Sequence, residues 1–94
     1  MRELVYADIE VKRLIREKFP YAKIKDASDY VHPERFEVEI ERISEEEFYR
    51  FAIRSGFAAV CFVFLCRLMD GDRTVKRWIQ EEMEKQMGNY EKGG

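Results

Sequence analysis

Residues Gly56–Cys66 read GFAAVCFVFLC, the longest stretch of the chain without a charged or strongly polar side chain. The stretch is too short to span a bilayer, which takes about 20 apolar residues. Its valines and phenylalanines favour a buried, pleated surface. Ser55-Gly56 at its start is typical of a helix end, and Asp70-Gly71-Asp72 after it is typical of a turn. We therefore predict a strand over residues 56–66 that is covered on both faces.

The composition indicates one small globular domain. Of the 94 residues, 38% are charged and 46% are hydrophobic, a balance that distinguishes the chain from disordered sequences. A net charge of −2 gives no whole-protein electrostatic reason to bind nucleic acid or an anionic membrane. Abundant Glu, Lys and Arg, with few Asn and Gln, resemble the composition of thermophile proteins. We expect one domain over residues 1–88 and a flexible tail over residues 89–94.

Cysteine usage and the N-terminal sequence bear on the cellular compartment. Cys61 and Cys66 are five residues apart, so they point to opposite faces of a strand and cannot pair with each other. We expect both to be buried, reduced thiols. The N-terminal sequence MRELVYADIE has acidic residues among its apolar ones and does not resemble a signal peptide. These patterns favour a cytoplasmic protein that does not bind membranes.

The first half of the chain predicts a helix followed by a hairpin. Apolar residues recur at steps of three and four over Arg2–Phe19, which is one face of an amphipathic helix. A second possibility is that Asp8 caps a shorter helix and Glu3–Tyr6 forms a short strand; we prefer the longer helix. Alternating residues over 21–26 and 36–41 predict two strands that pair in an antiparallel hairpin, with lysines opposite glutamates on the outer face.

The second half predicts two further helices on either side of the apolar run. Ser44 and Glu47 form a capping box that begins a helix ending at Ser55-Gly56. After Asp70-Gly71, residues 73–79 could continue either as a hairpin strand or as a helix that Asp72 caps. We choose the helix, because residues 80–87 are strong helix formers, and we expect it to stop at Gly88.

These elements together predict a small α+β domain in the order helix, strand, strand, helix, strand, helix. We expect a mainly antiparallel three-stranded sheet with helices packed on it. The outer face of the hairpin is charged, whereas the strand at 56–66 needs cover on both faces. The last helix, or a second copy of the chain, is expected to provide that cover.

No motif in the sequence points to catalysis or to a bound cofactor. His32 is the only histidine and lies in a turn beside Pro33, with Asp26, Asp29 and Glu34 nearby in sequence. A general base needs positioned partners and a metal site needs several ligands, and the sequence assembles neither around His32. Asp70-Gly71-Asp72 is similar to the opening of a calcium loop, but Val75 stands where such a loop needs glycine. We therefore expect a protein that is not an enzyme, with no catalytic, cofactor-binding or metal-binding residues.

The remaining features favour protein–protein association. The apolar run and the last helix carry large aromatic and methionine side chains, which are enriched at interface cores. We predict a non-enzymatic interaction module that self-associates or binds another protein. The candidate interface residues are Phe62, Phe64, Trp78, Ile79, Met83 and Met87.

A basic cluster suggests a second possible function. Arg73, Lys76 and Arg77 surround the start of the last predicted helix, where such a patch could bind phosphate groups. The outer face of the predicted hairpin is rich in glutamate and would repel a nucleic acid backbone. Nucleic-acid binding through these three residues is therefore the alternative function, and self-association is the one we favour.

Overall fold

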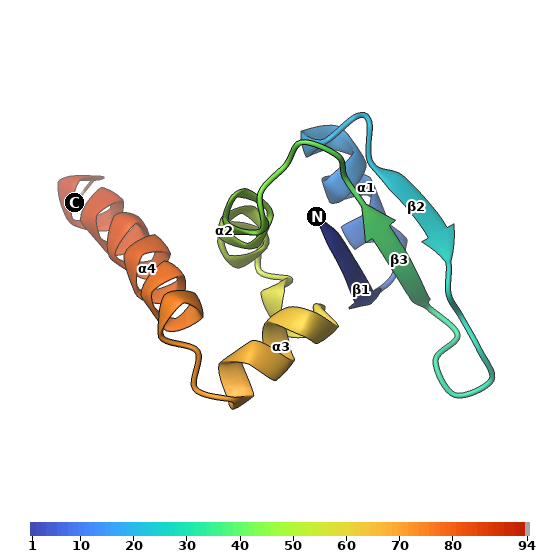
Figure 1. Cartoon of the computed structure of the whole chain (residues 1–94). Coiled ribbons are helices and arrows are strands. Elements are labelled where there is room, and N and C mark those ends of the chain that lie inside the picture. Colours follow the sequence, from blue (N-terminus) through green and yellow to red (C-terminus); the bar gives the residue numbers. More distant parts are fainter. Residues whose placement is uncertain (94) are drawn as a thin grey trace.

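The computed structural model describes the backbone of residues 1–93 and the side chains of residues 1–87. Within this part, three strands and four α-helices form one domain (Figure 1). In chain order the elements are β1 (Arg2–Tyr6), α1 (Ile9–Lys18), β2 (Lys23–Asp26), β3 (Arg35–Glu39), α2 (Glu45–Ser55), the 3₁₀ turn η1 (Ala58–Val60), α3 (Phe62–Met69) and α4 (Arg73–Gly93).

The three strands form one antiparallel sheet in the order β1-β3-β2. Val5 pairs with Phe36, and Ile24 pairs with Val38, so these residues share one face of the sheet. Helices pack on that face, and their core residues include Ile15, Phe48 and Tyr49. The predicted α+β class, with a three-stranded antiparallel sheet and helices packed on it, is confirmed.

The other face of the sheet is charged and open. Arg2 on β1 lies 3.6 Å from Glu37 and 3.5 Å from Glu39 of β3. On the opposite side of β3, Lys23 and Lys25 are paired in register with the same two glutamates. The predicted hairpin, with lysines opposite glutamates, is confirmed.

The prediction of one long first helix is wrong. Residues 2–6 form the edge strand β1, and α1 begins only at Ile9. The Asp8 side chain accepts a hydrogen bond from the Glu10 backbone N–H at 3.0 Å and so caps α1. The alternative, a shorter helix capped by Asp8 with a strand before it, is correct. Residues 2–6 are stable as a strand because they pair with an edge of β3 that would otherwise be free.

The strand predicted over residues 56–66 is also wrong. This segment forms η1 and the first half of α3, and its strand-like part is a single bridge between Val5 and Cys61. A short apolar run fits a buried helix as well as a buried strand, and periodicity alone does not separate the two. Both edges of β3 are occupied by β1 and β2, so the third strand comes from the N-terminus.

The helix chosen for residues 73–79 is confirmed. The Asp72 side chain caps α4, accepting hydrogen bonds from the N–H groups of Thr74 at 2.9 Å and Val75 at 3.2 Å. The predicted stop at Gly88 is wrong: α4 continues to Gly93, since one glycine inside a helix costs only about 1 kcal/mol. The flexibility expected for residues 89–94 stays a prediction, and Gly94 lies outside the described residues.

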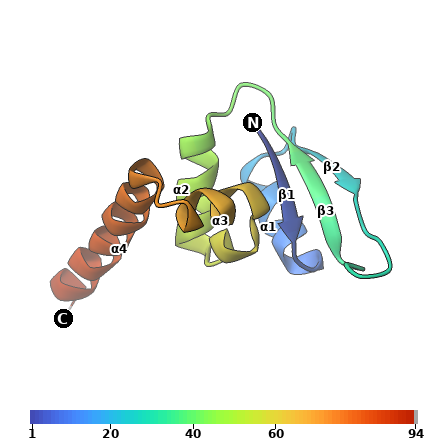
Figure 2. The ribbon, with the colours of Figure 1, turned by 60° about the horizontal axis from the view of Figure 1, so that its bottom comes forward.

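The domain is elongated because α4 extends away from it. Its dimensions are 45 × 30 × 27 Å. In both views α4 lies at the end remote from β2, with α2 and α3 between them (Figures 1 and 2). This arrangement leaves one side of α3 and the distal half of α4 away from the sheet.

Gly56 allows the chain to turn sharply from α2 into η1. Its φ is 82°, in the left-handed region, and a Cβ added there would meet no atom within 4 Å. We therefore expect Gly56→Ala to lower the free energy of unfolding by about 1–2 kcal/mol through the backbone alone. Gly56→Asn should lower it less, because asparagine tolerates this conformation. Guanidinium denaturation measures both; an alanine variant as stable as the wild type would contradict this explanation.

Candidate interaction surface

A buried carboxylate from β1 holds the N-terminus of α3. Cys61 is the residue before α3 and provides no side-chain cap. Instead, the backbone N–H groups of Val63 and Phe64 donate to the two carboxylate oxygens of Glu3 at 2.9 and 3.1 Å. The Tyr49 hydroxyl of α2 also donates to Glu3, at 2.6 Å. A single side chain thus joins the sheet, α2 and α3.

The surroundings of Glu3 keep two neighbouring groups protonated. Burial, together with the hydrogen bond to Glu3, raises the pKa of Tyr49 far above its usual value. Burial and the nearby Glu3 charge likewise raise the pKa of the Cys61 thiol. Tyr49 therefore remains a hydrogen-bond donor, and Cys61 remains an unreactive thiol.

The side of α3 that faces away from the core is apolar and exposed. Phe64 is 2% exposed and anchors the inner side of α3. On the outer side, Phe62, Leu65, Cys66 and Met69 are all exposed, Phe62 at 46% and Met69 at 79%. Their spacing of i, i+3, i+4 and i+7 places them on one face of the helix. Such a stripe is typical of a helix face that packs against another surface.

An open groove of about 270 Å³ lies beside this stripe. Leu65 and Leu68 of α3 form part of its wall, and Ile79 of α4 forms another part. The rest of the lining comes from the end of α2, η1 and the inner side of α3, namely Ile53, Gly56, Ala58, Ala59 and Phe64. The lining therefore carries no charged side chain, and the groove links the exposed stripe of α3 to α4.

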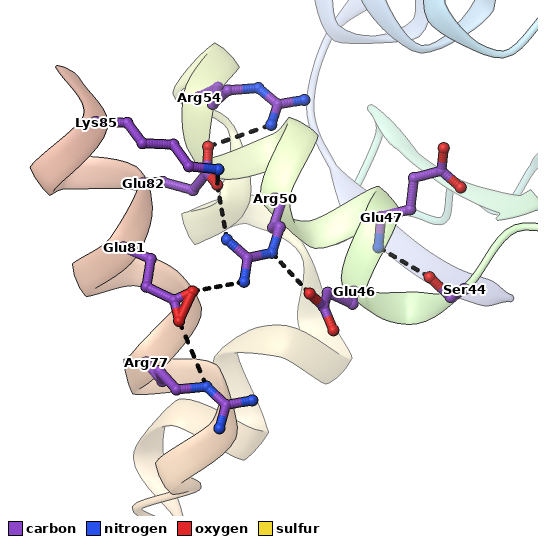
Figure 3. A network of polar contacts seen from close by, with 9 residues as sticks. All are labelled: Ser44, Glu46, Glu47, Arg50, Arg54, Arg77, Glu81, Glu82 and Lys85. Atoms are coloured by element: carbon purple, nitrogen blue, oxygen red, sulfur yellow. Dashed lines mark hydrogen bonds and ion pairs between the residues drawn. The ribbon is translucent and has the colours of Figure 1, made fainter. Parts of the chain in front are cut away.

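A network of ion pairs fixes α4 against α2 (Figure 3). Arg50 of α2 is at its centre. Its guanidinium donates to Glu46 at 2.9 Å, to Glu81 at 2.7 Å and to Glu82 at 2.9 Å. Glu82 is fully buried, and Arg54 of α2 donates to its second oxygen at 3.2 Å. Because these contacts orient one side of α4 toward α2, they also determine which side of α4 remains free.

The neighbouring side of α4 continues the apolar surface. Ile79 is partly buried in the groove, and Met83 and Met87 follow it at intervals of four residues, both exposed. We name this region the α3–α4 apolar surface. It comprises the exposed stripe of α3 and this side of α4, that is, Phe62, Leu65, Cys66, Met69, Ile79, Met83 and Met87.

The six candidate interface residues divide into two groups. Phe62, Ile79, Met83 and Met87 belong to the α3–α4 apolar surface. Phe64 and Trp78 do not, because they are 2% and 4% exposed and pack in the core against Tyr49. The strand interpretation of residues 56–66 obscured Leu65, Cys66 and Met69. Their helical spacing in the sequence could have identified them.

Cys66 differs from its predicted environment. We expected both thiols to be buried, yet Cys66 is exposed while Cys61 is fully buried. The reason is that Cys61, directly before α3, bridges Val5 of β1, whereas Cys66 lies on the outer side of α3. The chain therefore carries one accessible and one inaccessible cysteine.

The basic cluster lies at the exposed start of α4. Arg73, Lys76 and Arg77 are all exposed, and Arg77 makes an ion pair with Glu81 at 3.6 Å. This pairing reduces the positive charge available to a phosphate group. Nucleic-acid binding through the cluster stays a prediction.

His32 lies in a small polar cluster at the other end of the domain. Its ring contacts Tyr6 edge-on at 5.0 Å, and its Nδ1 lies 3.4 Å from the Asp29 carboxylate. Arg35, which also neighbours Tyr6, is occupied by hydrogen bonds to Ala27 and Asp29. Among the described residues, no three His, Cys, Asp or Glu side chains gather as a metal-binding group.

No protein-family model, curated protein or solved structure matches the chain. Within the part of the chain that the structure describes, no helix is both long enough and apolar enough to cross a bilayer. The α3–α4 apolar surface and the contacts that hold it in place are therefore the features of the molecule that bear on its function.

We expect Glu3→Gln to destabilise the protein by about 2–4 kcal/mol, because the amide cannot accept all the hydrogen bonds that the carboxylate accepts. The amide protons of Val63 and Phe64 should also exchange faster with solvent. Guanidinium denaturation and hydrogen exchange measure the two effects. Glu37→Gln, on the open face of the sheet, is the matched control and should change stability by less than about 0.5 kcal/mol. Equal effects of the two substitutions would contradict the capping role of Glu3.

The contact between α2 and α4 should weaken in acid. Burial raises the pKa of Glu82, but the hydrogen bonds from Arg50, Lys85 and Arg54 outweigh it, and the net shift is downward. The hydrogen bond from Arg50 also lowers the pKa of Glu81. A carboxylate with a lowered folded-state pKa stabilises the protein above its unfolded value, here 4.5, and this stability is lost as pH falls through the folded pKa.

We therefore expect the free energy of unfolding to decrease as the pH falls below about 5, and Glu82→Gln to make that decrease smaller. At pH 7 the substitution should destabilise the protein by about 1–3 kcal/mol. Glu84→Gln, on the exposed side of the same helix, is the control. Urea denaturation across this pH range tests the expectation, which fails if both variants retain the wild-type pH dependence.

Proposed function

We propose that this chain is a protein-interaction module that self-associates through the α3–α4 apolar surface. The observation that carries the proposal is the composition of α3. Arg67 is its only charged residue, and the helix presents apolar side chains both to the core and to solvent. A helix that is apolar all round is typical of a buried position.

The extent of the exposed apolar side chains supports the same function. With the exposed fractions of its residues, the α3–α4 apolar surface offers on the order of 600 Å², at the upper end of what monomers expose in one patch. A standard-size interface buries about 800 Å² on each partner. The apolar lining of the adjacent groove adds to the area that a second copy can cover.

The rigidity of the surrounding structure also favours this function. Glu3 anchors one end of α3, and Arg50 fixes α4 against α2. The exposed side chains therefore project from helices that are already positioned, which reduces the entropy that association would otherwise lose. Methionine at three positions of the surface suits a contact that must adapt its packing.

Light scattering over a range of protein concentrations tests the proposal. We expect the wild-type mass to rise from that of one chain, 11.3 kDa, to twice that value as the concentration increases. Met69→Glu should weaken association by more than about tenfold, because it places a charge in an apolar contact.

The matched control is Tyr21→Glu. Tyr21 is 92% exposed and lies in the connection between α1 and β2, beside residues of α1, of α2 and of the β3–α2 connection and away from α3 and α4. Tyr21→Glu should leave the mass unchanged, and circular dichroism should show both variants folded. A wild-type protein that stays monomeric at every concentration, or equal effects of the two substitutions, would disprove the proposal.

A further inference from the structure

The sequence of the α3 stripe points to a specific geometry for the self-associated protein, and this inference rests on the proposed function. We propose that two copies pack their α3 helices antiparallel across a two-fold axis that passes beside Cys66. The partner at this surface is thus a second copy of the chain, bound through the same residues on both sides.

The order of side chains along α3 is self-complementary in the antiparallel direction. Phe62 and Met69 stand at the two ends of the stripe, with Leu65 and Cys66 between them. In a two-fold contact, residue i of one copy contacts residue j of the other, and j contacts i. Phe62 of each copy therefore faces Met69 of the other, and the central Leu65 and Cys66 lie beside the axis. Each Phe62 ring then contacts the thioether of the partner copy's Met69, a favourable sulfur–aromatic pair. Cys66, the smallest side chain of the stripe, allows close approach at the axis.

The charge at the C-terminal end of α3 favours the antiparallel direction. Asp70, directly after α3, is exposed and makes no ion pair within residues 1–87. An antiparallel contact keeps the two Asp70 carboxylates apart, at opposite ends of the helix pair. A parallel contact would instead place them together, which is unfavourable.

The groove beside α3 gives this geometry room for side chains from the partner. It opens along Leu65, one step from Cys66 on the helix surface, and its lining is apolar. Ile79 of α4 also lines it, and the exposed Met83 and Met87 follow Ile79 along the helix at intervals of four residues. The partner copy's α3 can therefore cover the stripe while its neighbouring side chains enter the groove.

Disulfide trapping tests the position of the axis. Cys66 is accessible and Cys61 is buried, so the wild-type chain carries one reporter thiol at the proposed axis. With copper–phenanthroline and dissolved oxygen as oxidant, we expect a disulfide-linked dimer from the wild type and none from Cys66→Ser. A matched variant combines Cys66→Ser with Tyr21→Cys, at an exposed position away from α3 and α4, and reports random collision. The wild type should react at least about tenfold faster, since its thiols are held at high effective concentration.

The direction of packing is tested with two variants in the Cys66→Ser background. One carries Phe62→Cys and the other carries Met69→Cys, and intact mass spectrometry separates their dimers. Antiparallel packing predicts mixed disulfides between the two variants and few disulfides within either one. Disulfides formed mainly within each variant would overturn the antiparallel arrangement.

Light scattering on the same samples separates the failure of this geometry from the failure of self-association. A dimer by mass in which Cys66 reacts no faster than the collision control overturns the α3 axis and leaves the proposed function standing. A monomer by mass overturns both.

Discussion

The structure depends on one buried carboxylate that accepts hydrogen bonds from two distant parts of the chain. Glu3 lies in an edge strand, where a charged side chain on the inner face would ordinarily destabilise the core. Here it replaces the cap that Cys61 cannot provide, and it binds the Tyr49 hydroxyl as well. The negative charge at the start of α3 also complements the helix dipole. An apolar helix with only one charged residue is thereby held at the surface by polar contacts at its end.

Polar contacts also orient α4. Arg50 binds carboxylates on α2 and on α4, including the buried Glu82, while Val75 and Trp78 of α4 pack in the core. The exposed apolar residues of the two helices lie outside this core, and Leu65 of α3 and Ile79 of α4 line the groove between them.

The sequence predicted those parts of the fold that local patterns determine. Alternation over residues 36–41 identified β3, and the capping residues Ser44 and Asp72 identified the starts of α2 and α4. Prediction from the sequence failed where tertiary contacts determine the secondary structure. Residues 2–6 form a strand because β3 has a free edge, and residues 56–66 form a helix because Glu3 caps them from 60 residues away. Because these residues were interpreted as a strand, Leu65 and Met69 were not recognised as members of one exposed helix face.

The long separation between Glu3 and α3 has a consequence for the order of events during synthesis. Glu3 is made before the N–H groups that it binds, which follow 60 and 61 residues later. Contacts between residues so far apart form late, because a long loop must close first. Until this contact forms, α3 lacks its cap, and the groove stays incomplete until α4, which carries Ile79, has been made. We therefore expect a newly made chain to acquire the groove only after the start of α4 has emerged.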